Sequence, residues 1–338
     1  MDPRLVSAEQ IYRQDGPAQA LPEFQALLEV FRANSDTRNV AITEGYIGAL
    51  YWRLGDFEQS RRHLDIALQL KRAIGDRLQE GKTLNTLGLL EWDSGNYDLA
   101  TDRFLEAGRI GKETGNRKLE GSALNNLGLV YDERGNYRSS LEQYQEVLNI
   151  YNDIVFPRGK GDTLGNIGGV YLLLGYFSRA ADYYRQALEI SKELESTASM
   201  SQDYGNLGLC YTGSGRIDLA LQHFDQALKL AEEAGLRQEQ GIWLQGKANA
   251  EIKAGRYDLG LEYHRAALDI FAEVEAPALQ LEALHDMGQL LLSLGDPTSA
   301  EQHFERAFKL AQSIGLARAI TVNLIALGDL QYRHERYE

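Results

Sequence analysis

The sequence predicts an all-α protein, a solenoid of antiparallel helix hairpins, and three observations lead to this fold class. Glycine recurs every forty residues in two separate series. Apolar residues recur at offsets of three, four and seven, which place them on one stripe of a helix. The period continues along the whole chain, and a fixed period of this length is typical of repeat architectures. The two series are Gly55, Gly95, Gly135, Gly175, Gly215, Gly255 and Gly295, and Gly48, Gly88, Gly128, Gly168, Gly208, Gly288 and Gly328 with Ala248.

The first helix of each repeat is predicted over about positions 1 to 14, where a position is the residue number less a multiple of forty. Position 8 is small in every copy. Glycine inside a helix costs about 0.5–1 kcal/mol relative to alanine, so we expect another backbone to pass close to this position. Glycine at position 15, as at Gly135, predicts a left-handed residue that ends the helix.

The second helix carries small residues at position 20, bulky ones at 24, mostly alanine at 27 and aliphatic residues at 30. In one copy these are Ala180, Tyr184, Ala187 and Ile190. Their spacing places all four on one helical stripe, which is therefore the predicted core face.

A single solenoid domain over residues 1–338 is the predicted organisation, because each repeat packs only on its neighbours. Repeat 1 is a degenerate cap with Pro22 early in its second helix, and two later links gain Pro157 and Pro277, which we expect to bend the array locally. Glu335–Tyr337 are expected to form a turn and start another helix, which suggests a fragment of a longer protein continuing past Glu338. The repeats are 1–40, 41–80, 81–120, 121–160, 161–200, 201–240, 241–280, 281–320 and a partial 321–338.

The repeat resembles the tetratricopeptide repeat, whose pattern is L-G-x-x-Y followed by A-x-x-x-[FY]-x-x-A. The usual proline near the end of the second helix is missing, so that helix is expected to run on. The forty-residue form is similar to the arrays of Pins/LGN polarity adaptors and kinesin light chains, and to the arms of bacterial signalling proteins. This resemblance implies a right-handed superhelix with a concave groove. One matching copy has Leu207, Gly208, Tyr211, Ala220, Phe224 and Ala227.

The composition and charge of the chain restrict the classes of partner that it is expected to bind. The formal net charge of −14 disfavours nucleic acid. The chain has no run of about 18 apolar residues to span a membrane and no visible signal peptide. The single cysteine, Cys210, is expected to be a buried apolar residue. Together these features predict a cytoplasmic protein that binds neither nucleic acid nor membranes.

No catalytic, cofactor or metal site is predicted. Gly81-Lys82-Thr83 has the wrong spacing for a phosphate loop, and the repeat itself explains its glycine. The six histidines include no H-E-x-x-H motif and no cluster with cysteine. We therefore expect that the protein is not an enzyme.

Asparagines on the first helices are the main candidates for a binding site. The resemblance implies that positions 2, 5, 6, 9, 12 and 13 face the groove. The asparagines at position 6 would stack in a ladder and bind the backbone of an extended peptide; alternatively, they join neighbouring repeats. Asn126→Ala with Asn166→Ala is expected to weaken partner binding and leave the melting temperature nearly unchanged. The candidates are Asn85 and Asn125 at position 5, and Asn126, Asn166 and Asn206, with Tyr46, at position 6.

Other candidates flank this ladder. Trp52 and Trp92 occupy position 12 of successive repeats, where they either anchor an apolar side chain of the partner or belong to the core. Lys82 and Asp162 supply charges of both signs at position 2. The predicted groove therefore selects its ligand more by register than by bulk charge.

The predicted function is non-catalytic binding of a protein or peptide segment in the concave groove. A second hypothesis is a regulatory sensor arm of a larger signalling protein, such as a cyclase, kinase or transcription regulator, in which the groove binds a small effector or the output domain of the same chain. A third is a self-assembly scaffold that associates with further copies of itself.

Overall fold

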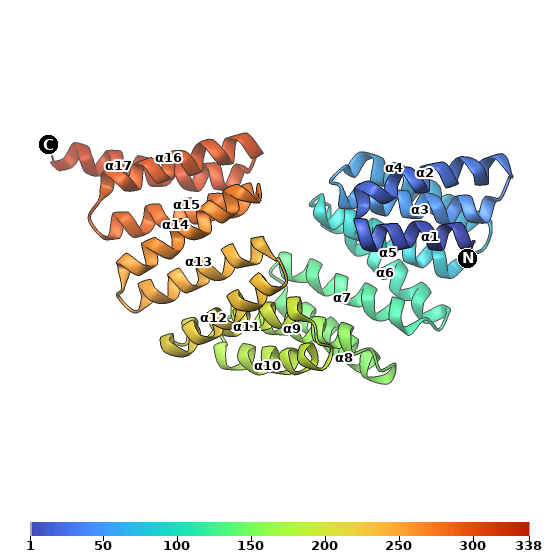
Figure 1. Cartoon of the computed structure of the whole chain (residues 1–338), viewed down its shortest axis with the longest axis horizontal. Coiled ribbons are helices and arrows are strands. Elements are labelled where there is room, and N and C mark those ends of the chain that lie inside the picture. Colours follow the sequence, from blue (N-terminus) through green and yellow to red (C-terminus); the bar gives the residue numbers. More distant parts are fainter. Residues whose placement is uncertain (1, 338) are drawn as a thin grey trace. The chain divides into compact units, whose positions relative to one another are not determined.

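The computed structural model describes residues 2–337, with side chains up to Tyr332, and every element in that range is an α-helix (Figure 1). The chain divides into two compact units, Met1–Val170 and Tyr171–Glu338. The first unit contains α1 (Pro3–Asp15), α2 (Pro17–Ala33), α3 (Thr37–Arg53), α4 (Phe57–Ala73), α5 (Arg77–Asp93), α6 (Tyr97–Glu113), α7 (Arg117–Glu133), α8 (Tyr137–Asp153) and most of α9 (Pro157–Leu173). The second contains α10 (Phe177–Glu193), α11 (Thr197–Gly213), α12 (Ile217–Glu233), α13 (Arg237–Lys253), α14 (Tyr257–Glu273), α15 (Pro277–Ser293), α16 (Pro297–Ile314) and α17 (Ala317–Tyr337).

The forty-residue period arises from two helices of equal length. Helices α3, α4, α5 and α6 each have 17 residues and are separated by three-residue links. The predicted start of the first helix was wrong by four residues, since α3 begins at Thr37. The reason is the N-cap: the Asp36 carboxylate accepts a hydrogen bond from the Asn39 amide and starts the helix there.

Each link ends one helix and begins the next. At the end of α3, the Asp56 amide donates to the Tyr51 carbonyl at 3.0 Å and the Gly55 amide to the Trp52 carbonyl at 3.1 Å. These two bonds form a Schellman motif, with Gly55 in the left-handed region at φ +80°. The Asp56 side chain then caps α4 by accepting from the Gln59 amide at 3.0 Å. The predicted left-handed glycine at position 15 is confirmed.

The two links with proline keep the conformation of the glycine links. The Phe156 amide donates to the Tyr151 carbonyl at 3.0 Å, as in the glycine links. Val155 and Glu275 take the left-handed residue's place at φ +50° and +52°. Proline fits because it stands at the first residue of α9 and α15, where the amide hydrogen has no helical partner.

Val155 is strained by this conformation, because a β-branched residue in the left-handed region is an outlier. Its side chain is 82% exposed and contributes little packing. We expect Val155→Gly to raise the free energy of unfolding by about 1 kcal/mol, as measured by urea denaturation. Glu195→Gly is the control, since Glu195 has the same φ without β-branching. A smaller increase in the free energy of unfolding is expected for Glu195→Gly. An equal decrease in both variants would contradict the interpretation that Val155 is strained.

The glycine at position 8 makes room for an aromatic ring in several hairpins, whereas the predicted close backbone is present at Gly48, where a Cβ atom would lie 3.0 Å from the Leu64 backbone nitrogen. A Cβ atom on Gly88 would lie 2.5 Å from the Phe104 ring, and one on Gly128 would lie 2.4 Å from the Tyr144 ring. Both rings belong to position 24 of the second helix in the same hairpin, and both are buried. The missing methyl group lets the two helices of a hairpin close on the aromatic side chain between them.

Gly88→Ala is expected to lower the free energy of unfolding by roughly 1–2 kcal/mol, because overpacking against the buried Phe104 ring outweighs the gain in helix propensity. Gly108→Ala is the matched control on α6: its Cβ would meet only the Ala123 Cβ, at 3.7 Å. The free energy of unfolding of Gly108→Ala is expected to rise by about 0.5 kcal/mol. Chemical denaturation of both variants measures the difference, and a gain in Gly88→Ala would contradict the ring contact.

The ends of the array depart from the regular repeat. Pro22 lies inside α2, and a single residue, Gly16, joins α1 to α2, as expected of a degenerate cap. At the other end, the predicted turn at Glu335–Tyr337 is wrong, because α17 continues through these residues to Tyr337. Position 15 is Glu335 here instead of glycine, so the residue that ends other first helices is missing. Glu338, after which the longer chain was predicted to continue, lies outside the described residues.

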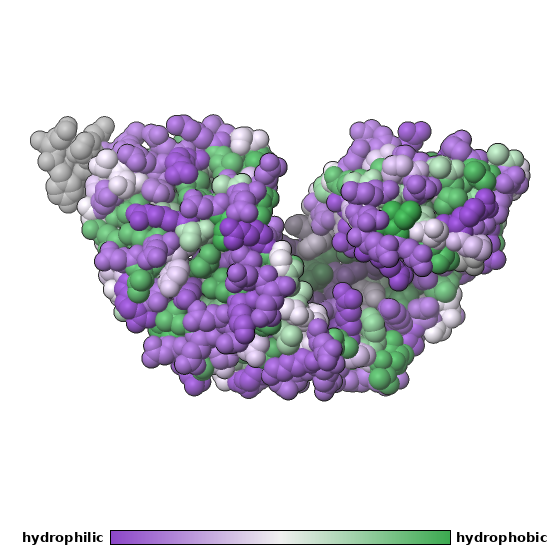
Figure 2. All heavy atoms as spheres, in the orientation of Figure 1, coloured by the Kyte–Doolittle hydropathy of each residue, from purple (hydrophilic) through white to green (hydrophobic). Residues whose placement is uncertain are grey.

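First helices line the inner side of the first unit. Helix α3 contacts α5, and α5 contacts α7, whereas no comparable contact joins α4 to α6. A hairpin array whose first helices approach each other more closely curves toward them, so α3, α5 and α7 form its concave face. Polar side chains cover most of the molecular face visible in Figure 2, in keeping with the net charge of −14.

Candidate functional site

Four of the predicted asparagines form hydrogen bonds between neighbouring first helices. Asn126 on α7 donates from Nδ2 to Asn85 Oδ1 on α5 at 3.1 Å. Asn166 on α9 donates in the same way to Asn125 Oδ1 on α7 at 3.1 Å. Position 6 therefore pairs with position 5 of the preceding repeat, not with position 6 as the predicted stack required. The fifth, Asn206, lies half-buried on α11 in the second unit.

These hydrogen bonds use only part of the hydrogen-bonding capacity of the asparagine side chains. An asparagine side chain has two donor hydrogens and one acceptor oxygen. Within the described residues, Asn85 and Asn125 use only their oxygens, and the latter also accepts from Thr163 Oγ1 at 3.2 Å. Both side chains are half-buried, so their Nδ2 groups stay available to a ligand. The row thus joins the repeats and retains free hydrogen-bonding capacity.

The bonds also revise one expectation. Asn126→Ala with Asn166→Ala removes two inter-repeat hydrogen bonds, each with a net contribution of about 1 kcal/mol. The double variant is therefore expected to lower the melting temperature, and it does not separate binding from stability.

Both predicted tryptophans are half-buried and pack against hydrophobic clusters. Trp52 donates from Nε1 to Asp93 Oδ2 at 2.5 Å, and Arg53 lies over its ring. Trp92 packs against the cluster that contains Phe104, and its buried Nε1 has no hydrogen-bond partner among the described residues. These contacts favour the core interpretation over the anchor interpretation for both side chains.

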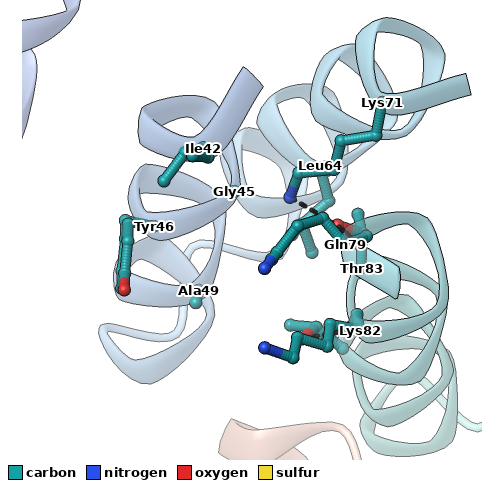
Figure 3. Close-up of a pocket in the computed structure, with 10 residues that line it drawn as sticks. Ile42, Gly45, Tyr46, Ala49, Leu64, Lys71, Gln79, Lys82 and Thr83 are labelled. Carbon is teal, nitrogen blue, oxygen red and sulfur yellow. Dashed lines mark hydrogen bonds between the residues drawn. The ribbon is translucent and has the colours of Figure 1, made fainter. Parts of the chain in front are cut away.

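A cavity of about 240 Å³ opens between α3, α4 and α5 in the first unit (Figure 3). Tyr46 and Lys82, both predicted groove residues, line it, and the Tyr46 ring is held in place by stacking on Phe24 at 4.9 Å. Asp162 lies exposed on α9 and is not part of the lining. The remaining lining is Ile42, Gly45, Ala49, Leu64, Lys71, Gln79, Thr83 and Thr86.

Lys71 is the polar centre of this cavity, and the sequence analysis missed it. Its side chain reaches from α4 to Thr83, to whose Oγ1 the ammonium donates at 2.7 Å. Only 5% of the residue is exposed. Burial lowers the pKa of Lys71 to about 8, an effect that Asp76 opposes and Lys82 reinforces.

The repeat pattern could have identified Lys71, because this lysine departs from the residue type at its position in the other repeats. It stands at position 31, the residue of each second helix that packs against the next first helix. The other copies place apolar or small residues there, all of them buried. These residues are Phe31, Gly111, Tyr151, Ser191, Ala231, Phe271 and Ala311.

Charge pairing separates Lys71 from the buried glutamates of the first unit. The buried Glu44 accepts from Arg32 at 2.7 Å, and the buried Glu80 accepts from Arg72 at 2.8 Å. By contrast, no carboxylate lies within 4 Å of the Lys71 ammonium in the part of the chain that the structure describes. Burying a charge without an opposite partner is costly, so this lysine is expected to have a function.

The described residues contain neither a metal-binding cluster nor a reactive thiol. No group of histidine, cysteine, aspartate and glutamate side chains there is arranged to hold a metal ion. Cys210 is buried on α11, and this burial raises the pKa of its thiol to about 12, so the thiolate nucleophile does not form near neutral pH. Among the described helices, none has the length and hydrophobicity needed to cross a bilayer.

The fold and the site define a helical-repeat protein that presents a polar inner face. The sequence pattern of the tetratricopeptide repeat matches residues 39–113, 80–153, 119–193, 159–233 and 239–313. The chain therefore belongs to the tetratricopeptide repeat family. The curated proteins include no match to it.

Solved structures show the same fold at low sequence identity. The apo form of the quorum sensor NprR from B. thuringiensis is 14% identical with a TM-score of 0.73, over 91% of this chain and 86% of that one. A Rap protein complexed with competence and sporulation factor is 17% identical with a TM-score of 0.58, over 99% and 98%. A STAND protein with a tetratricopeptide repeat sensor, from Pyrococcus horikoshii, is 15% identical with a TM-score of 0.68, over 93% and 47%.

Proposed function

We propose that this protein is a non-catalytic binding scaffold whose first unit holds an extended peptide against α3, α5 and α7. The observation that carries the proposal is the row of asparagine amides whose hydrogen-bonding capacity is only partly used. Asn85 and Asn125 keep free Nδ2 donors on the concave side. Backbone carbonyls of an extended peptide are the acceptors that such a row fits. The inter-repeat bonds fix the amides in advance, which reduces the entropy lost on binding.

The similar proteins support this proposal. NprR is described as a quorum sensor, and the Rap protein was solved with competence and sporulation factor. A peptide or protein segment is accordingly the proposed partner. The net charge of −14 argues against nucleic acid, and a cytoplasmic location suits a chain whose single cysteine is a buried free thiol.

The test uses variants that keep the oxygen atoms needed for the inter-repeat bonds, so that an effect on peptide binding can be distinguished from an effect on stability. In Asn85→Asp with Asn125→Asp, the oxygens that accept the inter-repeat bonds remain, but both free donors are lost. We expect wild type to select binders from a random-sequence peptide display library. We expect the double variant to bind them at least roughly ten-fold more weakly, a loss of about 1.4 kcal/mol, with an unchanged melting temperature.

The control is Asn149→Asp, which makes the same change at an exposed position of α8. Its affinity should equal that of wild type, measured by fluorescence polarisation with the selected peptides. Failure of wild type to select any peptide would contradict the function. Equal binding by the double variant would show that the asparagines serve only to join the repeats.

A sensor arm is the second candidate, favoured by the STAND protein, which carries a tetratricopeptide repeat sensor within a longer chain. In that case the groove regulates an output domain. The coding sequence of the full gene tests this hypothesis, because a catalytic or DNA-binding module in the same chain would support it. For the self-association hypothesis, light scattering of the purified chain gives the test.

A further inference from the structure

We propose that the link between α9 and α10 forms a second docking surface, which binds an apolar segment of a partner protein that carries an acidic residue. This link surface lies in the second unit, whereas Asn85 and Asn125 belong to the first. The inference therefore goes beyond the proposed function. The link surface consists of the exposed tip of the link and an aromatic cluster behind it. Its members are Tyr171, Leu173, Leu174, Tyr176, Arg179 and Tyr183.

The tip of this link is apolar, although the corresponding positions of the other hairpins are mostly polar. Leu173, Leu174 and Tyr176 are 69%, 40% and 55% exposed. Positions 13 and 16 carry polar residues or glycine in the other hairpins from α3 to α16, as at Asp93 and Asn96. Only this link has apolar or aromatic residues at positions 13, 14 and 16 together. Because the three side chains are exposed, packing within the chain does not explain the change, and an exposed apolar patch indicates an interaction site.

Tyr176 also occupies the position of a helix cap. At three other links the side chain at position 16, from Asp56, Asn136 or Asp296, accepts a hydrogen bond from the amide three residues further on. Tyr176 is the N-cap residue of α10 and forms no such bond. A side-chain cap stabilises a helix, so the tyrosine stands there at a cost in stability. Departures from local sequence rules are expected at functional sites.

The aromatic cluster behind the tip holds three tyrosine rings and one guanidinium together. The Tyr171 ring stacks on the Tyr183 ring with 5.5 Å between centroids, and the Tyr176 ring meets Tyr171 edge-on at 6.2 Å. The Arg179 guanidinium carbon lies 5.7 Å from the centroids of both Tyr171 and Tyr176. Tyr171 packs in turn against the buried core cluster around Phe224. These contacts order the side chains before binding, which reduces the entropy lost when a partner docks.

Arg179 determines the charge that a partner should carry. In the part of the chain that the structure describes, no carboxylate lies within 4 Å of its guanidinium, because the nearby Asp182 pairs with Arg185 at 2.7 Å. A guanidinium beside aromatic rings keeps its N–H donors for a carboxylate. Tyrosine and arginine are also the residue types that contribute most to binding at protein interfaces. An acidic residue flanked by apolar ones is therefore the segment that fits the link surface.

Two other occupants fit this surface less well. A second copy of the chain would bring another formal charge of −14 toward the first, and like charges oppose association. An anionic bilayer repels the same net charge, and a single arginine is not the cluster of basic residues that attracts anionic lipids. A different protein is therefore the proposed partner.

The test replaces the tip with the residues of the link between α5 and α6. The triple variant reproduces positions 13, 14 and 16 of that link, which this chain already forms as a three-residue connection. We expect its melting temperature, followed by circular dichroism, to equal or exceed that of wild type. The substitutions in the triple variant are Leu173→Asp, Leu174→Ser and Tyr176→Asn.

A random-sequence peptide display library supplies the probes. Wild type is the bait, and counter-selection on the triple variant removes every peptide that does not need the link surface. We expect the surviving peptides to carry an acidic residue between apolar ones. They should bind the triple variant at least roughly ten-fold more weakly than wild type, as measured by fluorescence polarisation. Arg179→Gln, which removes only the charge, should also weaken them.

The control is Leu54→Ser, at an exposed leucine in position 14 of the link between α3 and α4. The surviving peptides should bind this variant as they bind wild type. They should also bind Asn85→Asp with Asn125→Asp normally, because that variant leaves the link surface intact. Failure of the asparagine row to bind peptides would thus leave the link surface standing, and the converse also holds.

Three results would overturn the proposal. The first is that no peptide survives the counter-selection, and the second is that the survivors show no preference for an acidic residue. The third is that wild type, but not the triple variant, dimerises in sedimentation equilibrium or binds vesicles of phosphatidylcholine and phosphatidylserine. That result would assign the link surface to a second copy of the chain or to a membrane.

Discussion

Lys71→Met is expected to stabilise the protein at pH 7. The native pKa of Lys71 is about 8, against 10.5 for an ordinary lysine, and each unit of difference corresponds to 1.36 kcal/mol. The buried charge therefore costs up to about 3 kcal/mol of folding free energy at neutral pH. Methionine has a similar length, carries no charge and fills the same space. The lost hydrogen bond to Thr83 offsets part of the gain, about 1 kcal/mol.

The pH dependence of stability independently tests whether Lys71 destabilises the protein at neutral pH. Because the native pKa is lower than the unfolded one, the unfolded chain binds more protons between pH 8 and 10.5. The contribution of Lys71 to stability consequently rises with pH through this window. Wild type and Lys71→Met should differ most at pH 7 and approach each other near pH 10.

Urea denaturation at pH 7 and pH 10 measures both effects. Lys309→Met serves as the control, because Lys309 is exposed and its replacement should change stability by less than about 0.5 kcal/mol. A Lys71→Met protein less stable than wild type at pH 7 would mean that the lysine is retained for its bond to Thr83. A stabilised variant fits a residue that is kept for binding at a cost in stability.

The periodic features were predictable from the sequence because they depend on contacts within one hairpin. The glycine at position 15 specifies a left-handed φ, and the spacing of Ala180, Tyr184 and Ala187 specifies the buried stripe; the structure confirms both. Helix starts were less accurate, since the cap formed by Asp36 depends on local hydrogen bonding rather than on the apolar period.

The candidate site was only partly predictable because it depends on how neighbouring helices are offset. The asparagines at positions 5 and 6 are neighbours across repeats, but which positions pair follows from the relative shift of two first helices. Lys71 was missed because the analysis of the groove considered only first helices. Its departure from an otherwise apolar or small position 31 is visible in the sequence.

Trp243→Ala is expected to lower the free energy of unfolding by about 3–5 kcal/mol, the range for a buried tryptophan. Trp243 lies on α13 in the second unit and is 5% exposed. Its Nε1 donates to Ser201 Oγ at 3.1 Å, and this hydroxyl in turn donates to the Ala227 carbonyl at 2.9 Å. Removing the ring would leave a cavity in the core cluster that Phe224 and Trp243 share.

The ring fills the space that Gly205 leaves open, so position 5, a predicted groove position, belongs to the core in this repeat. A Cβ atom on Gly205 would lie 2.4 Å from the Trp243 ring. In two other repeats position 5 is asparagine and position 3 of the following repeat is smaller, as in Asn85 with Ala123 and Asn125 with Thr163. At Gly205 the absent side chain is matched to the large ring of Trp243.

This matching predicts a change of sign in a double-mutant cycle. Gly205→Ala should destabilise wild type by roughly 1–3 kcal/mol, because the new methyl group collides with the buried ring. In the Trp243→Ala background the same substitution should be neutral or stabilising, since the methyl group enters the vacated space and favours the helix. Urea denaturation of the four proteins measures the coupling energy. Additive effects would show that the two positions are independent and would contradict the matching of the Trp243 ring to Gly205.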